Sequence, residues 1–166
     1  NYMDTLAKTG VVVFDKTGTL TKGKFEVEAI HPNDFDEREL LHLAAHVERY
    51  STHPIAVSLK TAFGNEDDGC RVDNVEEIAG KGVKATVNGR TVYVGNSKLM
   101  ESIGARWHQC HKVGTIVHVA VDGTYAGHIV VTDVIKDDAK EAISRLKETG
   151  VEKTVMLTGD RAKVAD

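Results

Sequence analysis

The pattern of apolar and polar positions changes character twice along the 166 residues. Residues 11–14 form an uninterrupted apolar run, VVVF, between Gly10 and a polar turn. Such a run is typical of a short strand that is buried on both faces, inside a parallel sheet. Residues 25–30 instead alternate apolar and polar side chains, as expected for a strand with one buried face. We therefore place a domain boundary between the two, at the charged connector of residues 22–24.

The segment that follows has helical periodicity. Apolar residues at helical spacing predict a helix over residues 36–49, which Asn33 or Asp34 would cap. A second helix is predicted over residues 54–63, with Pro54 in its first turn, where the missing N–H costs nothing. Both helices have one apolar face and are expected to pack on a sheet.

From residue 71 onward the period becomes two. Alternating strands flank the turn sequences Asn-Gly at residues 88–89 and Asp-Gly at residues 122–123, which are strong hairpin signals. A short helix is predicted over residues 97–103. This part of the chain predicts an antiparallel sheet of about six strands that carries helices.

The end of the chain returns to the pattern of its start. Residues 129–131 are again a continuous apolar run, a helix is predicted over residues 136–149, and residues 154–157 form a second buried strand. A strand, a helix and a strand with short links form the βαβ unit of a parallel sheet.

These patterns predict the fold class α/β, with an inserted α+β domain. Residues 25–128 form the inserted domain, an antiparallel sheet with flanking helices. Residues 1–24 and 129–166 together form a partial parallel α/β domain. A length of 166 residues suits two such small domains.

Composition and charge exclude several classes of protein. Hydrophobic residues make up 41% of the chain and charged residues 28%, which is ordinary for a packed, soluble protein. A net charge of −4 without a basic run argues against nucleic-acid binding. No apolar stretch approaches the ~18 residues that span a bilayer. Cys70 and Cys110 are isolated, so a reducing, cytoplasmic setting is expected.

The first candidate catalytic residues lie directly after the first apolar run. Asp15 is the first polar residue after it, and catalytic groups collect past the carboxyl ends of parallel strands. A carboxylate there can act as a nucleophile and accept a phosphoryl group. Lys16 adds a positive charge, Thr17 a hydroxyl group, and Gly18 lets the backbone approach an anion.

A second anion-binding turn follows the other buried strand. It consists of Thr158, Gly159 and Asp160. If the two strands are neighbours in one sheet, this turn lies at the same edge as Asp15. Thr158 and the adjacent backbone N–H groups would then hold the phosphoryl group as it moves onto Asp15.

The inserted domain contains candidate residues for a nucleotide. His53 starts a helix, where its ring would stack on a purine or hydrogen-bond to it. Glu48 would accept a hydrogen bond from an exocyclic amine. Gly80 and Gly82 flank a stretch where the backbone would lie against a nucleotide without a Cβ clash. Each of these residues also has a purely structural interpretation, as a helix start, a helix end or a turn.

Taken together, the motifs resemble one family. Residues 15–21, DKTGTLT, resemble the phosphorylation signature of P-type ATPases, within the haloacid-dehalogenase-like class. The motifs of the inserted domain resemble the nucleotide-binding domain of the heavy-metal-transporting P-type ATPases, type P1B. These motif residues are Glu48, His53, Pro54, Gly80, Gly82, Gly95 and Asn96. Tyr93 departs from the family, which has a glycine at the start of the last motif.

The resemblance implies a reaction and its cofactors. ATP would bind in the inserted domain, and its γ-phosphoryl group would be transferred to Asp15 with the help of Mg²⁺. Asp15 and the backbone of Thr17 would hold the Mg²⁺ ion. Lys16, Thr17 and the turn at residues 158–160 would contact the transferred group.

The resemblance also implies partners and a location. ATP or ADP, the rest of the phosphorylation domain, the actuator domain and the membrane helices of a larger transporter would be the partners. These residues would be a cytoplasmic portion of an integral membrane protein. The transported cation would be held by the membrane helices and not by this chain. The sequence of residues 156–161, MLTGDR, favours the zinc, cadmium and lead branch over the copper branch.

The family pattern continues past Thr-Gly-Asp with a phosphate-binding lysine and a Gly-Asp-Gly-x-Asn-Asp segment that holds Mg²⁺. These 166 residues contain neither feature. We therefore interpret the chain as a fragment of a longer transporter and expect it to bind nucleotide without appreciable turnover.

Two other functions are compatible with the motifs, a phosphatase of the same fold with a large cap and a non-catalytic nucleotide-binding module. Thr17 argues against the phosphatase. Hydrolases of this class have an aspartate at that position as general acid and base, and such help is worth on the order of 10²–10⁴ in rate. A long-lived phosphoenzyme suits a transporter better than a phosphatase.

Histidine and cysteine groups raise the question of metal binding. Residues 108–111, HQCH, offer three potential ligands at a spacing too short for tetrahedral closure. We interpret them as an exposed loop with adventitious metal affinity. His42 and His46 are four residues apart on a predicted helix, but the sequence shows no third ligand for them.

Overall fold

The computed structural model describes residues 9–64 and 68–157, and the chain divides into two compact units. We call Phe25–Thr132 the central unit, and Asn1–Lys24 with Asp133–Asp166 the terminal unit. The chain passes into the central unit along one strand and returns along another. The return falls between Thr132 and Asp133, slightly later than the sequence pattern predicts.

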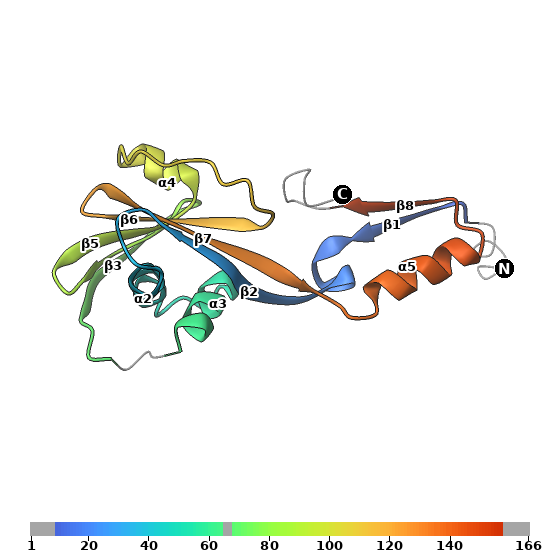
Figure 1. The fold of residues 1–166 in the computed structure, drawn as a ribbon, viewed down its shortest axis with the longest axis horizontal. Helices are drawn as coiled ribbons and strands as arrows, with labels where there is room; N and C mark the ends of the chain where they lie inside the picture. The colour runs from blue at the N-terminus through green and yellow to red at the C-terminus, as the bar shows by residue number, and fades with distance from the viewer. Residues whose placement is uncertain (1–8, 65–67, 158–166) are drawn as a thin grey trace. The chain divides into compact units, whose positions relative to one another are not determined.

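Six strands of the described chain form the sheet of the central unit, in the order β2-β7-β6-β5-β4-β3 (Figure 1). Their bounds are β2 Thr21–Pro32, β3 Val72–Ile78, β4 Gly82–Val87, β5 Arg90–Gly95, β6 Thr115–Val121 and β7 Thr124–Ile135. The pairs from β3 to β7 are antiparallel, so the predicted antiparallel sheet is confirmed. At both predicted hairpins the two turn residues have positive φ angles, as type I′ turns require.

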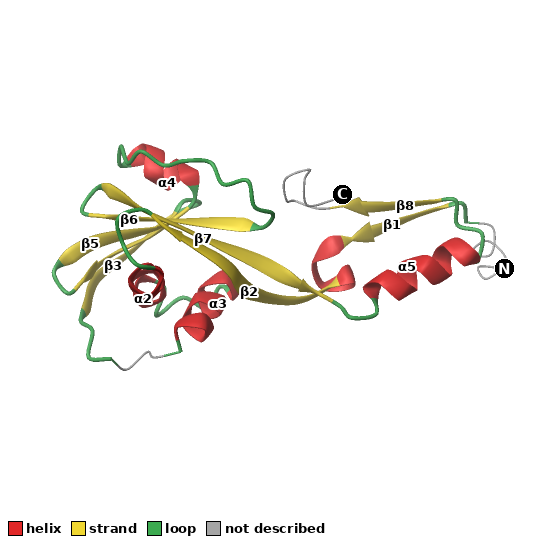
Figure 2. Ribbon diagram, in the orientation of Figure 1, coloured by secondary structure: helices red, strands yellow, loops and turns green. Residues whose placement is uncertain are grey.

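Helices cover both faces of this sheet. Those in the described part of the central unit are α2 Glu37–Val47, α3 Pro54–Phe63 and α4 Ser97–Ser102. Figure 2 shows α2 and α3 on one face and α4 on the other. Neighbouring residues of β6 point to opposite faces, so Val119 packs in the larger core cluster and Ala120 in the smaller one. None of the described helices is both long and apolar enough to cross a membrane.

The start of α2 differs from the prediction. The side chain of Asp36 caps the helix by accepting a hydrogen bond from the backbone N–H of Glu39, at 2.8 Å. Neither Asn33 nor Asp34 is the cap. The reason is that the chain at Asn33 is still attached to the sheet, where its backbone N–H donates to the carbonyl of Ala126 at 2.8 Å. The helix can begin only after the chain has left that hydrogen bond.

The terminal unit contains a short parallel sheet. Its described elements are β1 Val11–Asp15, the irregular helical turn η1 Lys16–Leu20, α5 Ala139–Glu148 and β8 Lys153–Leu157. Strands β1 and β8 pair in parallel, with Asp15 opposite Leu157. The predicted burial of β1 on both faces is wrong for the described residues, because Val11 and Val13 are each 53% exposed. Within this part of the chain, β8 is the sole strand paired with β1.

The predicted βαβ unit at the end of the chain is also wrong in one respect. Ile129, Val130 and Val131 lie in β7 of the antiparallel sheet, and β8 pairs with β1 instead. All three residues are fully buried: Ile129 and Val131 pack in the larger core cluster, and Val130 lies on the opposite face, near Gly114. A continuous apolar run is therefore typical of a strand with both faces covered, whether its neighbours are parallel or antiparallel.

Candidate functional site

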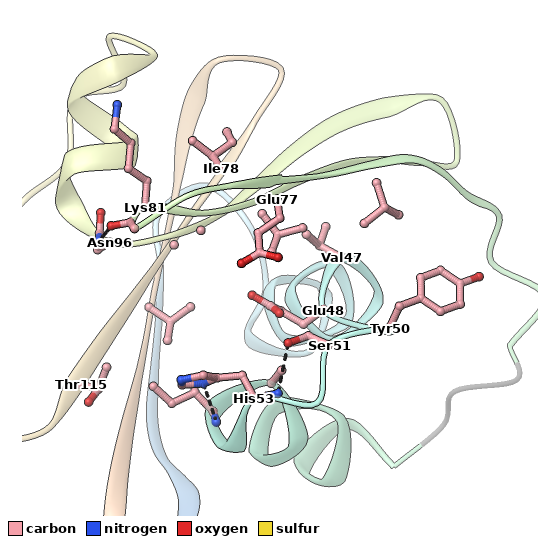
Figure 3. Close-up of a pocket in the computed structure, with 18 of the residues that line it drawn as sticks. Val47, Glu48, Tyr50, Ser51, His53, Glu77, Ile78, Lys81, Asn96 and Thr115 are labelled. Carbon is pink, nitrogen blue, oxygen red and sulfur yellow. Dashed lines mark hydrogen bonds between the residues drawn. The ribbon is translucent and has the colours of Figure 1, made fainter.

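The central unit contains a cavity of about 760 Å³ between the end of α2, the start of α3 and the ends of β3, β4 and β5. Figure 3 shows the side chains that line it. Six of the predicted nucleotide residues belong to this lining. They are Glu48, His53, Gly80, Gly82, Gly95 and Asn96. The seventh, Pro54, lies in the first turn of α3 and does not line the cavity. Residues up to 48 positions apart in sequence are thus gathered around one space.

Glu48 is half-buried at the end of α2, and its backbone N–H closes the last turn on the carbonyl of Ala44. Burial raises the pKa of its carboxyl group, and the neighbouring Glu77 raises it further, whereas Ser51, His53 and Lys60 oppose the shift. Figure 3 shows the side chains of Glu48 and Glu77 facing each other. A partly desolvated carboxylate of this kind is a strong hydrogen-bond acceptor for a ligand N–H group.

His53 is the cap of α3. Its Nδ1 accepts a hydrogen bond from the backbone N–H of Ile55 at 3.3 Å, which fixes the ring at the mouth of the cavity (Figure 3). With Nδ1 used as an acceptor, the neutral ring has its proton on Nε2. The side chain is exposed, so its ring face and Nε2–H are accessible to a planar, polar ligand.

Lys60 was not predicted, although it organises the loop that carries these residues. From α3 its Nζ donates to the carbonyl oxygens of Arg49, at 3.1 Å, and Ser51, at 2.9 Å. The loop between Glu48 and His53 is thereby held against α3. A lysine on a helix usually extends into solvent, so the sequence offers no signal for this role except that Lys60 lies two turns after His53 on the same helix.

Gly82 and Gly95 have a structural reason to be glycine. They are directly opposite each other in β4 and β5. A Cβ atom on Gly82 would lie 2.1 Å from the carbonyl oxygen of Val94, and one on Gly95 would lie 2.1 Å from that of Lys81. The predicted reason, close approach to a nucleotide, is thus accompanied by a close approach of two strands. Gly80 differs, because a Cβ there would have no atom within 4 Å, and its requirement is a positive φ of 69° alone.

Asn96 connects the end of β5 to the turn between β3 and β4. Its Nδ2 donates to the carbonyl of Gly80 at 2.9 Å, and its Oδ1 accepts from the backbone N–H of Leu99 at 3.2 Å, which caps α4. Both polar atoms of the amide are therefore used inside the protein. Asn96 is a positioning residue, which holds the Gly80 turn at the edge of the cavity.

The phosphorylation motif forms a separate site in the terminal unit. Asp15 is exposed at the carboxyl end of β1, and the chain then turns through η1 with a positive φ of 79° at Gly18. The hydroxyl of Thr21 accepts from the N–H of Gly18 and lies within hydrogen-bonding distance of Asp133. Lys136 donates to the carbonyl of Gly18 at 3.2 Å. Asp133 and Lys136, which follow the central unit in the sequence, thus hold the turn in place.

The second predicted anion-binding turn lies outside the described residues. Thr158, Gly159 and Asp160 come directly after β8, which ends at Leu157 opposite Asp15. Asp133 was not predicted to contact the motif. Its Oδ1 is buried and has no hydrogen-bond partner among the described residues.

The sequence interpretation of the histidines needs one correction. His42 and His46 do have neighbours with potential ligand atoms, because Asp68 and Cys70 lie beside them in space. The sequence could not show this, since these two residues are separated from α2 by α3 and a loop. Cys110 lies with His31 and His128.

A parallel strand that ends in the exposed aspartate of a DKTGTLT motif, together with an inserted sheet domain, is typical of the haloacid-dehalogenase-like class. Comparison with family models agrees, because residues 9–166 match the model described as haloacid dehalogenase-like hydrolase.

Comparisons with individual proteins are more specific. The chain is 49% identical over 165 residues to a zinc-transporting ATPase of Synechocystis sp., a match that covers 99% of this chain and 23% of the relative. It is 46% identical over 167 residues to a cadmium, zinc and cobalt-transporting ATPase of Bacillus subtilis, covering 100% of this chain and 24% of that relative. The chain thus spans about a quarter of the length of these curated relatives.

Solved structures give the same assignment. A zinc-transporting PIB-type ATPase in the E2.Pi state is 35% identical, with a TM-score of 0.73 over 98% of this chain and 28% of that one. The N-domain of a copper-transporting P-type ATPase is 27% identical, with a TM-score of 0.58 over 64% of this chain and 97% of the N-domain. The chain therefore belongs to the haloacid dehalogenase-like hydrolase family, and within it to the catalytic region of P1B-type heavy-metal ATPases, as N-domain plus part of the P-domain.

Proposed function

We propose that the central unit binds ATP or ADP in its 760 Å³ cavity and that Asp15 is the phosphoryl acceptor of a metal-transporting ATPase. The observation that carries the proposal is the convergence of six motif residues on this one cavity. The cavity also has the size of a small-molecule site, which is typically about 300–1,000 Å³.

The adenosine part of the nucleotide fits the chemistry of the lining. The exposed ring of His53 stacks on the base, an interaction worth about 1–3 kcal/mol. The half-buried carboxylate of Glu48 accepts a hydrogen bond from the exocyclic amine. Lys60 and Asn96 keep the two loops in the geometry that this binding requires.

Asp15 performs the group transfer. One oxygen of its carboxylate attacks the γ-phosphorus, and the bond between that phosphorus and the bridging oxygen of ADP breaks, so that an aspartyl phosphate and ADP are the products. The exposure of Asp15 at the end of β1 permits this attack. Lys16 offsets the negative charge of the transferred group, and Thr17 and the turn at residues 158–160 would hold that group with hydrogen-bond donors.

Mg²⁺ fits the oxygen atoms of the turn that begins at Asp15, because carboxylate and carbonyl oxygens are the ligands that it prefers. The carboxylate of Asp15 and the backbone carbonyl of Thr17 would hold the ion. When bound, it supplies positive charge to the phosphoryl oxygens. The hydroxyl of Thr17 cannot act as a general acid or base near neutral pH, so hydrolysis of the aspartyl phosphate is slow.

The parent protein is proposed to be a membrane transporter for zinc or a chemically similar cation, with these residues on its cytoplasmic side. The zinc and cadmium relatives, at 49% and 46% identity, support this choice over the copper relatives, such as that of Archaeoglobus fulgidus at 41%. The rest of the P-domain, an actuator domain and membrane helices are its proposed partners.

Calorimetric titration of the 166-residue chain with ADP tests the nucleotide site. We expect one binding site, and we expect His53→Gln to weaken binding about 5- to 150-fold, which corresponds to the loss of one stacking interaction. The matched control is His111→Gln, which changes an exposed histidine outside the cavity. Equal affinity for the wild type and the His53→Gln variant would refute the site.

A turnover assay separates the proposed function from the phosphatase alternative. We propose that this chain alone hydrolyses neither ATP nor p-nitrophenyl phosphate at an appreciable rate. The reason is that Thr17 stands where the phosphatases have their general acid and base. Release of p-nitrophenol that depends on Asp15, tested with Asp15→Asn, would favour the phosphatase.

A further inference from the structure

We propose that the central unit has a second binding site, for Zn²⁺ or a similar divalent transition-metal ion, formed by His42, His46, Asp68 and Cys70. The four ligand atoms, two nitrogens, an oxygen and a sulfur, all lie within 4.8 Å of one another. The two histidines are four residues apart on α2, so their rings project from the same face of the helix. The other two ligands come from the loop after α3.

The ligand atoms already converge on one point. Asp68 Oδ2 lies 2.9 Å from His42 Nε2 and 3.1 Å from His46 Nε2. His46 is 2% exposed and makes a hydrogen bond to the carboxylate. His42 Nε2 is buried, and its one described polar contact is the ion-pair contact with the same carboxylate. One carboxylate oxygen thus lies beside two imidazole nitrogens, and a metal ion would bind all three atoms once the carboxylate has moved slightly away from the rings.

The local structure directs the remaining ligands to the same place. Asp68 Oδ1 accepts a hydrogen bond from the backbone N–H of Cys70 at 2.9 Å, which orients the loop with both side chains toward α2. The ring of Phe63 packs on both imidazoles, with centroid distances of 5.2 Å to His42 and 5.6 Å to His46. The histidine rings are thus held in place, whereas the loop ligands have room to adjust.

The donor set selects the class of metal. Two imidazoles, a thiolate and a carboxylate match tetrahedral zinc, whereas Mg²⁺ and Ca²⁺ prefer oxygen ligands alone. Bond lengths of about 2.0–2.3 Å place tetrahedral ligand atoms roughly 3.3–3.8 Å apart. The carboxylate therefore has to move away from the two imidazoles by a few tenths of an ångström, while any wider pair within the 4.8 Å group closes.

The site is separate from the nucleotide cavity. None of its four ligands lines that cavity, so the proposal stands whether or not nucleotide binds there. His46 nevertheless lies two residues before Glu48 on the chain. A bound ion would tie the loop after α3 to the last turns of α2.

Titration with Co²⁺, followed by visible absorption, tests the proposal on the intact chain. We expect one equivalent of Co²⁺ to produce the d–d bands of a tetrahedral ion and a thiolate-to-cobalt charge-transfer band. Zn²⁺ should displace the bound Co²⁺ and remove these bands. Cys70→Ser should abolish the charge-transfer band and weaken binding at least about 100-fold, since even outer-shell partners of a metal are worth about 10–100-fold. His42→Gln should weaken binding to a similar extent.

A matched control uses the other cysteine. Cys110 lies with His31 and His128 in a second group of three potential ligands, so Cys110→Ser removes a thiol without touching the proposed site. The cobalt spectrum of this variant should equal that of the wild type. Cys70 and Asp68 lie on a loop, and metal-free circular dichroism of Cys70→Ser and Asp68→Asn will show native folding.

Three results would overturn the proposal. The first is a spectrum of six-coordinate cobalt without a thiolate band. The second is a charge-transfer band that survives in Cys70→Ser and disappears in Cys110→Ser. The third is unchanged Co²⁺ affinity in both His42→Gln and Asp68→Asn.

Discussion

The two units position their functional groups in different ways. In the central unit the candidate residues are held by side-chain contacts inside the unit, such as Lys60 on the loop before α3 and Asn96 on the Gly80 turn. In the terminal unit Asp15 is placed by a two-stranded sheet whose outer residues, Val11 and Val13, are half exposed. The proposed nucleotide residues are thus held by contacts within one continuous segment of chain, whereas the turn after Asp15 is held by Asp133 and Lys136, which are more than a hundred residues away in sequence.

The largest effect is expected from a glycine of the central unit. Gly95→Ala places a Cβ 2.1 Å from the carbonyl oxygen of Lys81, so we expect a loss of about 3 kcal/mol of unfolding free energy. Gly10→Ala in the terminal unit is the control, because its nearest atom would be the flexible end of Glu152 at 4.0 Å. Urea denaturation measures both variants. Similar stability of the two variants would contradict the described strand packing.

The next largest effect concerns Glu48 and pH. Its carboxylate form accepts from the ligand, and its pKa is raised above the ordinary 4.5, mainly by burial. ADP affinity should therefore fall as the pH drops through that raised pKa, by about 10- to 150-fold in total, the value of a charged hydrogen bond. In Glu48→Gln this part of the pH dependence should be absent, and titrations of both proteins across the acidic range provide the test.

Glu48 should also lower the stability of the fold. A raised carboxyl pKa in the folded state means that the folded protein binds protons more readily than the unfolded one, so this group favours folding at low pH and opposes it at neutral pH. Glu48→Gln should therefore raise the melting temperature at neutral pH while it weakens ADP binding. The matched control Glu101→Gln changes an exposed carboxylate on α4 and should alter neither quantity.

A smaller effect is expected in the terminal unit. Thr21→Val removes the hydroxyl that accepts from Gly18 and contacts Asp133, so we expect a local loss of about 1–3 kcal/mol. Hydrogen exchange of β1 and η1 should accelerate, while ADP affinity stays unchanged. Thr19→Val, at an exposed position of the same turn, is the control. A large loss of ADP affinity in Thr21→Val would contradict the independence of the two units.

The smallest effect is expected at Lys60. Lys60→Met removes two hydrogen bonds to the loop but keeps the aliphatic stem, so ADP binding should weaken roughly 5-fold, the value of about 1 kcal/mol. Lys98→Met, on the exposed side of α4, should have no effect. Calorimetry distinguishes the two variants. An unchanged affinity in Lys60→Met would show that the loop keeps its geometry without this anchor.

The sequence predicts much of the fold, because turns and helix starts require particular residue types for their backbone conformation. Such residues are strong local signals. The hairpin turns at residues 88–89 and 122–123 and the proline at the start of α3 all appear as predicted. The failures concern burial and long-range contacts. The run Ile129–Val131 was assigned to the wrong sheet, because its burial comes from segments packed on both faces that the run itself does not specify.

The candidate site shows the same division. The sequence motifs select the residues that surround the cavity, but they give no sign of the groups that hold them. Lys60 acts on carbonyl oxygens of a loop, and Asp133 reaches Thr21 across more than a hundred residues. Asp68 and Cys70 lie beside His42 only because the chain folds back toward α2 after α3. Contacts of this kind depend on the tertiary fold, which a local pattern cannot express.

The central claim is that the nucleotide binds in the cavity between α2, α3 and the ends of β3 to β5. Amide chemical shifts of the isotope-labelled chain, followed during titration with ADP, test it most directly. The account predicts that the largest changes fall on residues 48–55, 80–82 and 95–96. Changes centred instead on a separate hollow beside the start of α2, which is lined by Asp36, Glu39 and Phe63, or no changes at all, would contradict it.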